Sequence, residues 1–261
     1  MTARSGAVAK PGAAAIRSAA GIRTLETEAE CAAEGVRALV GMDEVGRGSL
    51  AGPVGVGAVR YAVGSALSGR DEGIRVPPEE LLAAEVAGIP AGLRDSKQVS
   101  PGRRGPLAEA VALWRPQHAV AYASAAEIDR VGITMALNLA GRRALAALAV
   151  HGPADLVLLD GSHDWLSAPL TLDAAAVFAE AADVEVPPVR TFVKGDGRIA
   201  TIAGASILAK TNRDARMRDL DAEFPGYGWA GNAGYGSQQH REAIRALGVT
   251  PHHRTSWNLG V

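Results

Sequence analysis

The sequence predicts an α/β domain in which helices cover a mixed β-sheet. Short apolar runs typical of strands alternate along the chain with longer amphipathic segments typical of helices. The composition is 48% hydrophobic but only 4% aromatic, so the core must be built mainly from Val, Ile, Leu and Ala. The alternation runs from about residue 39 to residue 258, a length that one domain can accommodate.

Five segments are expected to be strands because each is short, apolar and bounded by polar or glycine-containing turns. They are ALVGMDE (38–44), VGVGAVRYAV (54–63), HAVAYASA (118–125), ADLVLLDG (154–161) and VRTFVKGD (189–196). Helices are expected where apolar residues recur at helical spacing after a polar turn or a capping residue. These segments are 95–114, 124–150, 199–224 and 237–248.

Two segments are expected to lie outside this framework. Residues 1–38 contain scattered Arg, Pro and Gly without an unbroken apolar core, which indicates a disordered tail and not a signal peptide. Residues 62–92 mix Gly and Pro with one short helical stretch, which favours a surface insertion. A single cysteine, Cys31, excludes an internal disulfide, and no apolar run approaches the roughly 18 residues of a membrane span. We therefore expect a cytoplasmic protein that does not enter membranes.

Charge is distributed unevenly along the chain. The formal net charge is −1, which argues against an obvious, uniformly basic nucleic-acid binder. The region from Arg190 to Arg218 nevertheless holds seven cations and only Asp196 and Asp214 as acids. Such a region could grip a polyanion, or it could be the solvated face of a helix, and the sequence alone leaves both interpretations open.

Several carboxylates fall where strands are expected to end. Asp43 and Glu44 end one strand, Asp160 ends another, and Asp196 follows a third, while Asp214 lies on the long helix over 199–224. Ligands collect at strand ends in open α/β sheets, and clustered carboxylates are costly to bury unless a cation joins them. Oxygen ligands of this type suit Mg²⁺ or Mn²⁺. The alternative is that a strand-terminal Asp before a turn glycine is only turn chemistry.

Other catalytic motifs are absent from the sequence. There is no Walker-A loop and no G-x-S-x-G elbow, so ATP hydrolysis and serine esterase chemistry are poor candidates. The pair His252-His253 is too closely spaced and too isolated to indicate a zinc site. The residues alone therefore leave two interpretations, metal-dependent phosphoryl chemistry and acids that are only turn residues.

Seven motifs in order over about 220 residues resemble bacterial ribonuclease HII, the type 2 ribonuclease H family. They are MDEVGRGSLAGP, GLRDSKQVS, AEIDRVGITMALNLA, LLDG, VKGDGRIATIAGASILAKTNRDARM, GYG and TPHHRTSW. The resemblance implies a ribonuclease H-like, mixed five-stranded sheet flanked by helices, with a helical C-terminal part. It also implies cleavage of RNA in RNA/DNA hybrids and incision 5′ to ribonucleotides embedded in duplex DNA. Water activated by Mg²⁺ or Mn²⁺ would leave 3′-hydroxyl and 5′-phosphate ends.

The resemblance also assigns roles to individual residues. The family's four catalytic, metal-binding acids map onto Asp43, Glu44, Asp160 and Asp214, and the resemblance selects Asp214 over Asp196. The loop Gly46-Arg47-Gly48 would read the 2′-hydroxyl, because glycine lets the backbone approach the sugar closely. The remaining substrate contacts are expected from Tyr235, Lys97, Lys194 and Ser206, with Lys210 on the same helix face as Ser206.

The chain departs from the family pattern at several places. Ser49 stands where the family usually has proline after the glycine loop, and Asn232-Ala233 stands where it typically has His-Lys. Residues 162–188 are longer than a minimal member needs, so the helix and strand positions there are left open. The C-terminal HHRTSWNLGV carries no convincing peptide for binding a sliding clamp. The expected partners are RNA/DNA hybrids and ribonucleotide-containing duplex DNA, with the protein itself a monomer.

Two other kinds of protein would share parts of this pattern. Ribonuclease HIII has a similar fold, but that family typically adds an N-terminal binding domain and carries lysine in the glycine loop, where this chain has Arg47. A non-catalytic hybrid-binding protein would have lost its acids, whereas all four candidates are present here.

Overall fold

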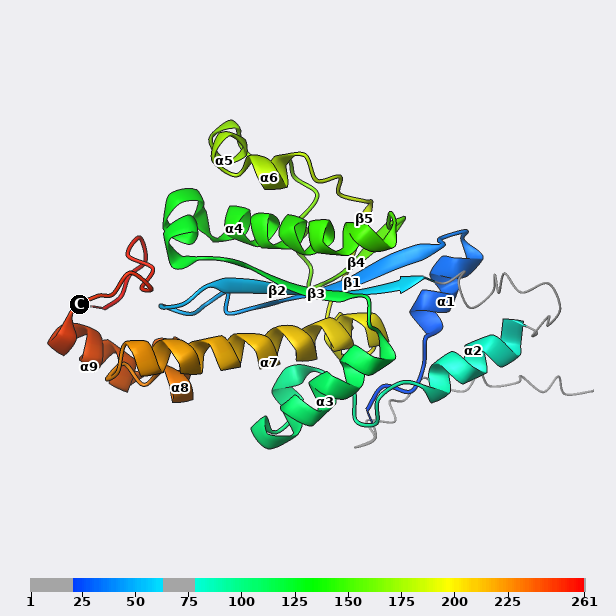
Figure 1. Cartoon of the computed structure of the whole chain (residues 1–261), viewed down its shortest axis with the longest axis horizontal. Helices are drawn as coiled ribbons and strands as arrows, with labels where there is room; N and C mark the ends of the chain where they lie inside the picture. The colour runs from blue at the N-terminus through cyan, green and yellow to red at the C-terminus, as the bar shows by residue number, and fades with distance from the viewer. Residues whose placement is uncertain (1–20, 63–77, 261) are drawn as a thin grey trace, which may run out of the picture.

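A five-stranded mixed sheet forms the centre of the molecule (Figure 1). The computed structural model describes residues 21–62 and 78–260. The strands are β1 (Ala38–Val45), β2 (Val54–Ala62), β3 (His118–Ala123), β4 (Leu156–Asp160) and β5 (Val189–Phe192), in the spatial order β3-β2-β1-β4-β5. β2 pairs antiparallel with β1 and β3, whereas β1, β4 and β5 run parallel. The expected mixed five-stranded sheet is confirmed.

Successive residues of β1 alternate between two separate cores. Leu39 packs in the core below the sheet, while Val40 and Met42 pack in the core above it. Two glycines on the lower face allow a helix to lie very close to the sheet. A Cβ on Gly41 would stand 2.5 Å from the backbone of Thr201, and one on Gly57 would stand 2.2 Å from the carbonyl oxygen of Ala205. Glycine is therefore required where this helix crosses the sheet.

The upper layer is built on α4 (Ala125–Leu148), with α5 (Leu172–Val177) and α6 (Ala179–Ala182) above it (Figure 1). A capping box closes the start of α4, since the Ser124 side chain accepts from the Glu127 amide and the Glu127 carboxylate accepts from the Ser124 amide. Residues 125–151 are long and apolar enough to cross a membrane. The apolar face of α4 is nevertheless buried against the sheet, as in the core helix of a globular domain.

The lower layer consists of α7 (Ala200–Glu223) and α3 (Pro101–Trp114), with α2 (Pro78–Ala87) and the short 3-10 turns η1 (Ser96–Gln98) and η3 (Gly195–Gly197) between the main elements. A third 3-10 turn, η2 (Ala149–His151), directly follows α4 in the upper layer. The middle of the 62–92 segment lies outside the described residues. The helices expected over 95–114, 124–150 and 199–224 are confirmed within a few residues of their predicted ends.

The expected tail over residues 1–38 differs from the structure in its second half. Residues 26–33 form helix α1 (Glu26–Ala33), and Leu25 and Cys31 are buried in the lower core. Glu28 is buried as well, and its carboxylate accepts hydrogen bonds from the amide and hydroxyl of Thr201 at 2.9 and 3.0 Å. This contact caps an open amide at the start of α7, and Ile22 and Leu25 are buried as well, so residues 22–33 belong to the packed domain. Residues 1–20 lie outside the described part of the chain.

The helical C-terminal part lies at one end of the sheet, beside the connection from β1 to β2 (Figure 1). It contains α8 (Trp229–Asn232), α9 (Gln238–Leu247) and the segment 250–257, which pairs with the β1–β2 connection through an Ala51–His253 bridge. Trp229, His240 and His253 form its buried centre.

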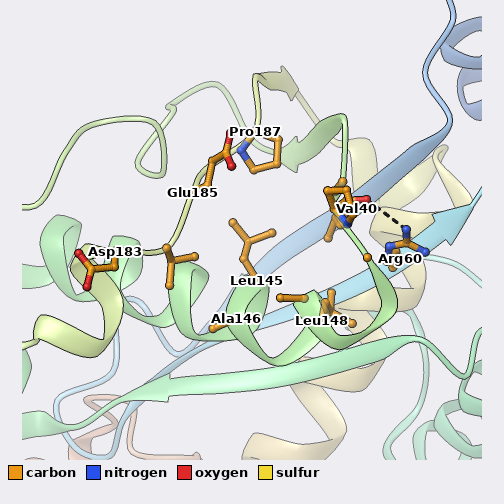
Figure 2. A pocket seen from close by; sticks show the side chains of 13 residues that line it. Val40, Arg60, Leu145, Ala146, Leu148, Asp183, Glu185 and Pro187 are labelled. Atoms are coloured by element: carbon orange, nitrogen blue, oxygen red, sulfur yellow. Dashed lines mark hydrogen bonds between the residues drawn. The ribbon is translucent and has the colours of Figure 1, made fainter.

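A cavity of about 490 Å³ opens at the opposite end of the sheet, on the α4 face (Figure 2). Arg60 of β2 lines it together with apolar residues such as Leu145 and Leu148 of α4. Arg60 is 8% exposed, and its guanidinium donates to the Pro153 carbonyl at 3.1 Å and to the Gln117 side chain at 2.7 Å. Arg60 thus ties together the chain segments that begin β3 and β4.

Candidate metal and nucleic-acid site

A second cavity, of about 460 Å³, lies on the α7 face where β1 ends. It brings together residues from four separate parts of the chain: the end of β1 with the glycine loop after it, η1 with α3, the middle of α7, and the turn that carries Tyr235. The lining includes most of the residues predicted for the site, namely Asp43, Glu44, Gly46, Arg47, Gly48, Lys97, Ser206 and Tyr235. Arg104 and Lys210 contribute two further cations.

Three carboxylates meet at this end of the sheet. Asp43, Asp160 and Asp196 each offer an oxygen, and these oxygens lie within 4.8 Å of one another. The strand register explains the first two, because β1 and β4 are parallel with Met42 opposite Leu159, which brings the next residues, Asp43 and Asp160, together. Asp196 joins them from η3, where its amide donates to the Asp160 carboxylate at 3.2 Å.

The protein's own charges leave this carboxylate group unbalanced. Burial, reinforced by the charges of Asp160, Glu44 and Asp196, raises the pKa of Asp43 well above its usual value, although the Ser206 hydroxyl opposes the rise. Burial and the charge of Asp160 likewise raise the pKa of Asp196 to about 6. Clustered oxygen ligands that repel one another match the needs of a small hard cation such as Mg²⁺ or Mn²⁺. The residues present therefore fit a divalent metal.

Lys97 is the cation whose pKa these carboxylates raise. Burial disfavours its charge, but the carboxylates of Asp43, Asp95, Asp196 and Asp160 outweigh that effect and raise its pKa. The Asp95 side chain also accepts from the Lys97 amide at 2.8 Å, which fixes η1 at the edge of the site.

Asp214 does not join the carboxylate group, and this corrects the prediction that chose it over Asp196. Its two oxygens are bound to cations, to Lys210 Nζ at 2.7 Å and to Arg104 Nη1 at 3.4 Å. The physical reason is position along α7. Asp214 lies eight residues beyond Ser206, roughly 12 Å further along the helix axis, whereas Asp196 immediately precedes the helix beside Asp160. Asp214 instead holds two cations at the rim of the cavity.

Glu44 also stands apart from the three aspartates. Glu44 follows Asp43 directly, at the point where β1 ends. It lines the same cavity near the end of the strand, and its carboxylate lies 3.6 Å from Arg47 Nη1.

The glycine loop after β1 has a conformation that its sequence requires. Gly46 has φ +77°, and a Cβ there would stand 2.1 Å from the Nε of the buried Arg213. Gly48 lies close to the Tyr235 ring, since its ideal Cβ position is 4.0 Å from that ring. Tyr235 is 42% exposed and forms one wall of the cavity. Lys194, by contrast, is exposed at the start of η3 and does not line the cavity.

Ser49 and Asn232, which depart from the family pattern, each make hydrogen bonds that shape the backbone next to the site. Ser49 is buried, and its amide donates to the Gly46 carbonyl at 3.3 Å, a bond that proline could not make. The side chain of Asn232 accepts from the Gly234 amide at 2.8 Å and donates to the Tyr227 carbonyl at 2.8 Å. Asn232 therefore shapes the turn that carries Tyr235.

Fold and site together define a class. A mixed five-stranded sheet covered by helices, with clustered carboxylates at the ends of two neighbouring parallel strands, is the framework of a ribonuclease H-type, metal-dependent nuclease. The sequence profile described as "Ribonuclease HII" matches residues 89–259. A curated ribonuclease HII from Ruegeria sp. (strain TM1040) is 42% identical over 233 residues, which cover 89% of this chain and 83% of that protein. The chain belongs to the ribonuclease HII family and is an endoribonuclease.

Solved structures share the fold at low sequence identity. Ribonuclease H2 from Pyrococcus horikoshii OT3 has a TM-score of 0.58 at 21% identity, covering 85% of this chain and 94% of that one. Bst-RNase HIII, solved in complex with Mn²⁺, has a TM-score of 0.59 at 20% identity, covering 85% of this chain and 67% of that one.

Proposed function

We propose that this chain cuts the RNA strand of RNA/DNA hybrids and incises duplex DNA on the 5′ side of an embedded ribonucleotide, leaving 3′-hydroxyl and 5′-phosphate ends. The observation that carries this proposal is the cavity beside the carboxylate group: Asp43, which belongs to that group, lines it together with the Gly46–Gly48 loop. A hydrolytic site next to a backbone surface suited to reading a sugar links cleavage to the identity of the nucleotide.

In this proposal Asp43, Asp160 and Asp196 hold the divalent metal, Mg²⁺ or Mn²⁺. Glu44 supports them from the strand end through its charge. A metal at this position supplies Lewis-acid activation of water and of the scissile phosphate. The protein's part is to fix the three carboxylates on paired strands before substrate arrives, so that little reorganisation is needed during the reaction.

The remaining residues of the cavity orient the nucleic acid. Lys97, Arg104 and Lys210 present positive charge beside the carboxylates and suit backbone phosphates. The Gly46-Arg47-Gly48 backbone would contact the 2′-hydroxyl, Arg47 a neighbouring phosphate, and Tyr235 the ribose.

Ser206 donates to Ser96 Oγ at 3.0 Å, so its role is to hold η1 against α7. Lys194 is placed to meet phosphates outside the cavity. The protein would act as a cytoplasmic monomer.

The test is cleavage of a labelled DNA duplex that carries one ribonucleotide, with and without Mg²⁺ or Mn²⁺, together with mapping of the cut. An all-DNA duplex of the same sequence is the matched control. Metal-dependent incision 5′ to the ribonucleotide, with the control left whole, is the expected result. Cleavage of long hybrids alone would remove the role given to the glycine loop, and no cleavage by folded protein would favour a hybrid-binding protein without activity.

A further inference from the structure

Two arginines are buried behind the glycine loop without an acidic partner. Arg213 on α7 and Arg254 in the C-terminal segment are both 0% exposed. Neither guanidinium takes part in an ion pair among residues 21–62 and 78–260. Burying a cation without a counter-ion is costly, and burial followed by the charge of Arg213 lowers the pKa of Arg254 to about 9. Two buried, unpaired arginines are therefore expected to do more than fill space in the core.

Both guanidinium groups donate mainly to backbone carbonyls of a single short segment, residues 46–53. Arg254 donates to the carbonyls of Gly46 at 2.7 Å, Arg47 at 2.8 Å and Gly52 at 3.1 Å. Arg213 donates to two more in the same segment and to one in the Tyr235 turn; these are Pro53 at 2.9 Å, Ala51 at 3.2 Å and Ala233 at 2.9 Å. The two side chains thus fix the peptide orientations of the loop and link it to the turn.

The direction of these bonds decides which groups of the loop face the cavity. In a planar trans peptide the carbonyl and the following amide point in opposite directions. Because the carbonyls of Gly46 and Arg47 point at Arg254, the amides of Arg47 and Gly48 point away from it. Within the described part of the chain neither of these two amides has a hydrogen-bond partner. Two free backbone donors are therefore presented at the residues that line the cavity.

The C-terminal segment is itself fastened so that Arg254 cannot shift easily. The Asp129 carboxylate of α4 accepts from the amides and hydroxyls of Thr255 and Ser256 at 2.6 to 3.1 Å. On the other side of Arg254, the His253 ring accepts from the Thr250 amide at 2.9 Å. The Arg254 amide also donates to the Leu50 carbonyl at 2.9 Å.

We propose that Arg254 is a positioning residue for ribonucleotide recognition: its guanidinium turns the Gly46 and Arg47 carbonyls inward and thereby points the following amides at the 2′-hydroxyl. Arg213 assists by fixing the distance between this loop and the Tyr235 turn. This inference rests on the proposed function, since it assigns the residue that makes the loop competent to read the sugar. Arg254 itself touches neither substrate nor metal.

Arg254→Lys is the variant of choice, because it keeps the charge but has one nitrogen where the guanidinium uses three to reach three carbonyls. The measurement is binding, without divalent metal, of a duplex with one ribonucleotide and of the same duplex in all-DNA form. Wild type is expected to prefer the ribonucleotide duplex. Arg254→Lys is expected to bind the all-DNA duplex unchanged, to lose that preference, and to lose roughly tenfold or more in kcat/KM at the single ribonucleotide.

Arg60→Lys is the matched control. Arg60 is equally a buried arginine that donates to a backbone carbonyl, but it lies on the α4 face at the far end of the sheet (Figure 2). It should lose thermal stability while keeping the ribonucleotide preference. Equal loss of preference in Arg60→Lys and Arg254→Lys would overturn the proposal, because it would show a general effect of replacing buried arginine. Retained preference in folded Arg254→Lys would overturn it directly.

Asp129→Ala provides a second variant if Arg254→Lys does not fold. It removes the anchor of residues 255–256 from an exposed position and leaves every loop residue in place. A reduced ribonucleotide preference with intact binding of all-DNA duplex supports the proposal, and an unchanged preference contradicts it. A wild-type protein with neither cleavage nor preference would instead refute the proposed function, which separates the two failures.

Discussion

Two groups of buried charge flank the Gly46–Gly48 loop, and the protein satisfies them in opposite ways. On one side three carboxylates crowd together, and burial reinforced by their mutual repulsion raises the pKa of Asp43 and of Asp196. On the other side two guanidinium groups have their donors taken up by backbone carbonyls. The comparison teaches that buried charge alone does not mark a reactive site. The carboxylates keep oxygens available to bind a cation. The N–H groups of the arginines are instead used in hydrogen bonds that fix the backbone of the loop.

The largest expected effect is on kcat, and it should differ between substitutions of Asp196 and of Asp214. Asp196→Asn should lower kcat by roughly 1,000-fold, as should Asp43→Asn, because each removes a carboxylate from the metal-holding group. Asp214→Asn should cost only about tenfold, since it loosens Lys210 and Arg104 but leaves the group intact. Steady-state kinetics with Mg²⁺ on an RNA/DNA hybrid, with circular dichroism as a folding check, measures all three. Equal losses for Asp196→Asn and Asp214→Asn would contradict the assignment.

Metal should stabilise the fold through the carboxylate group. A ligand that binds only the folded state at 100 times its Kd adds about 2.7 kcal/mol. For a domain of this size that corresponds to a rise of roughly 5 °C or more in Tm. Thermal melts of wild type with increasing Mn²⁺ should show this rise, and Asp160→Asn should not. A similar rise in the variant would place the stabilising ion elsewhere.

Acid should weaken the C-terminal part through His253. Burial, followed by the charge of His240, lowers the pKa of His253 from 6.5 to about 4. Below pH 6.5 the unfolded chain takes up a proton that the folded protein excludes, so stability is lost as pH falls from about 6.5 to about 4. The loss amounts to roughly 3 kcal/mol. Urea unfolding of wild type and His253→Gln across this range measures it.

The variant should show a smaller loss than wild type over that interval. Asp43 and Asp196, whose pKa values are shifted upward, titrate in both proteins, so the difference between the two curves isolates His253. Parallel curves would mean that this histidine does not control the acid response.

The smallest expected effect on stability belongs to Arg47. Its ion pair with Glu44 spans 3.6 Å and its side chain is 46% exposed, so Arg47→Ala should change the free energy of unfolding by less than about 0.5 kcal/mol. The same change should reduce the salt dependence of hybrid binding by about one phosphate contact. Binding at several salt concentrations tests this, and an unchanged slope would show that Arg47 makes no phosphate contact.

Strand positions could be predicted from sequence because apolar runs and turn residues act locally. The five segments agree with β1–β5 within a few residues. Helix α1 was missed because its sequence, ETEAECAA, has no apolar face that local patterning could detect, and its burial depends on Thr201. The C-terminal helix over 237–248 was found because a serine cap and a clear alternation of polar and apolar faces define it.

Site residues at the ends of strands could be predicted from the sequence. Site residues whose place depends on how the helices pack against the sheet could not. Asp43 and Asp160 follow from the ends of two strands, but the choice between Asp196 and Asp214 required the position of α7. The basic region between Arg190 and Arg218 proved to be neither one binding surface nor one solvated face. Arg190 pairs with Glu34 on α1, while Arg213 is buried behind the loop.

The bond between Arg254 and the Gly46 carbonyl joins residues 208 positions apart in the chain. Synthesis proceeds from the N-terminus, so the glycine loop is made long before the arginine that supports it. A nascent chain that has not yet reached Arg254 can pair β1 with β4 and assemble its carboxylates while the loop beside them stays unsupported. Discrimination between ribose and deoxyribose would then be gained later than the carboxylate group itself.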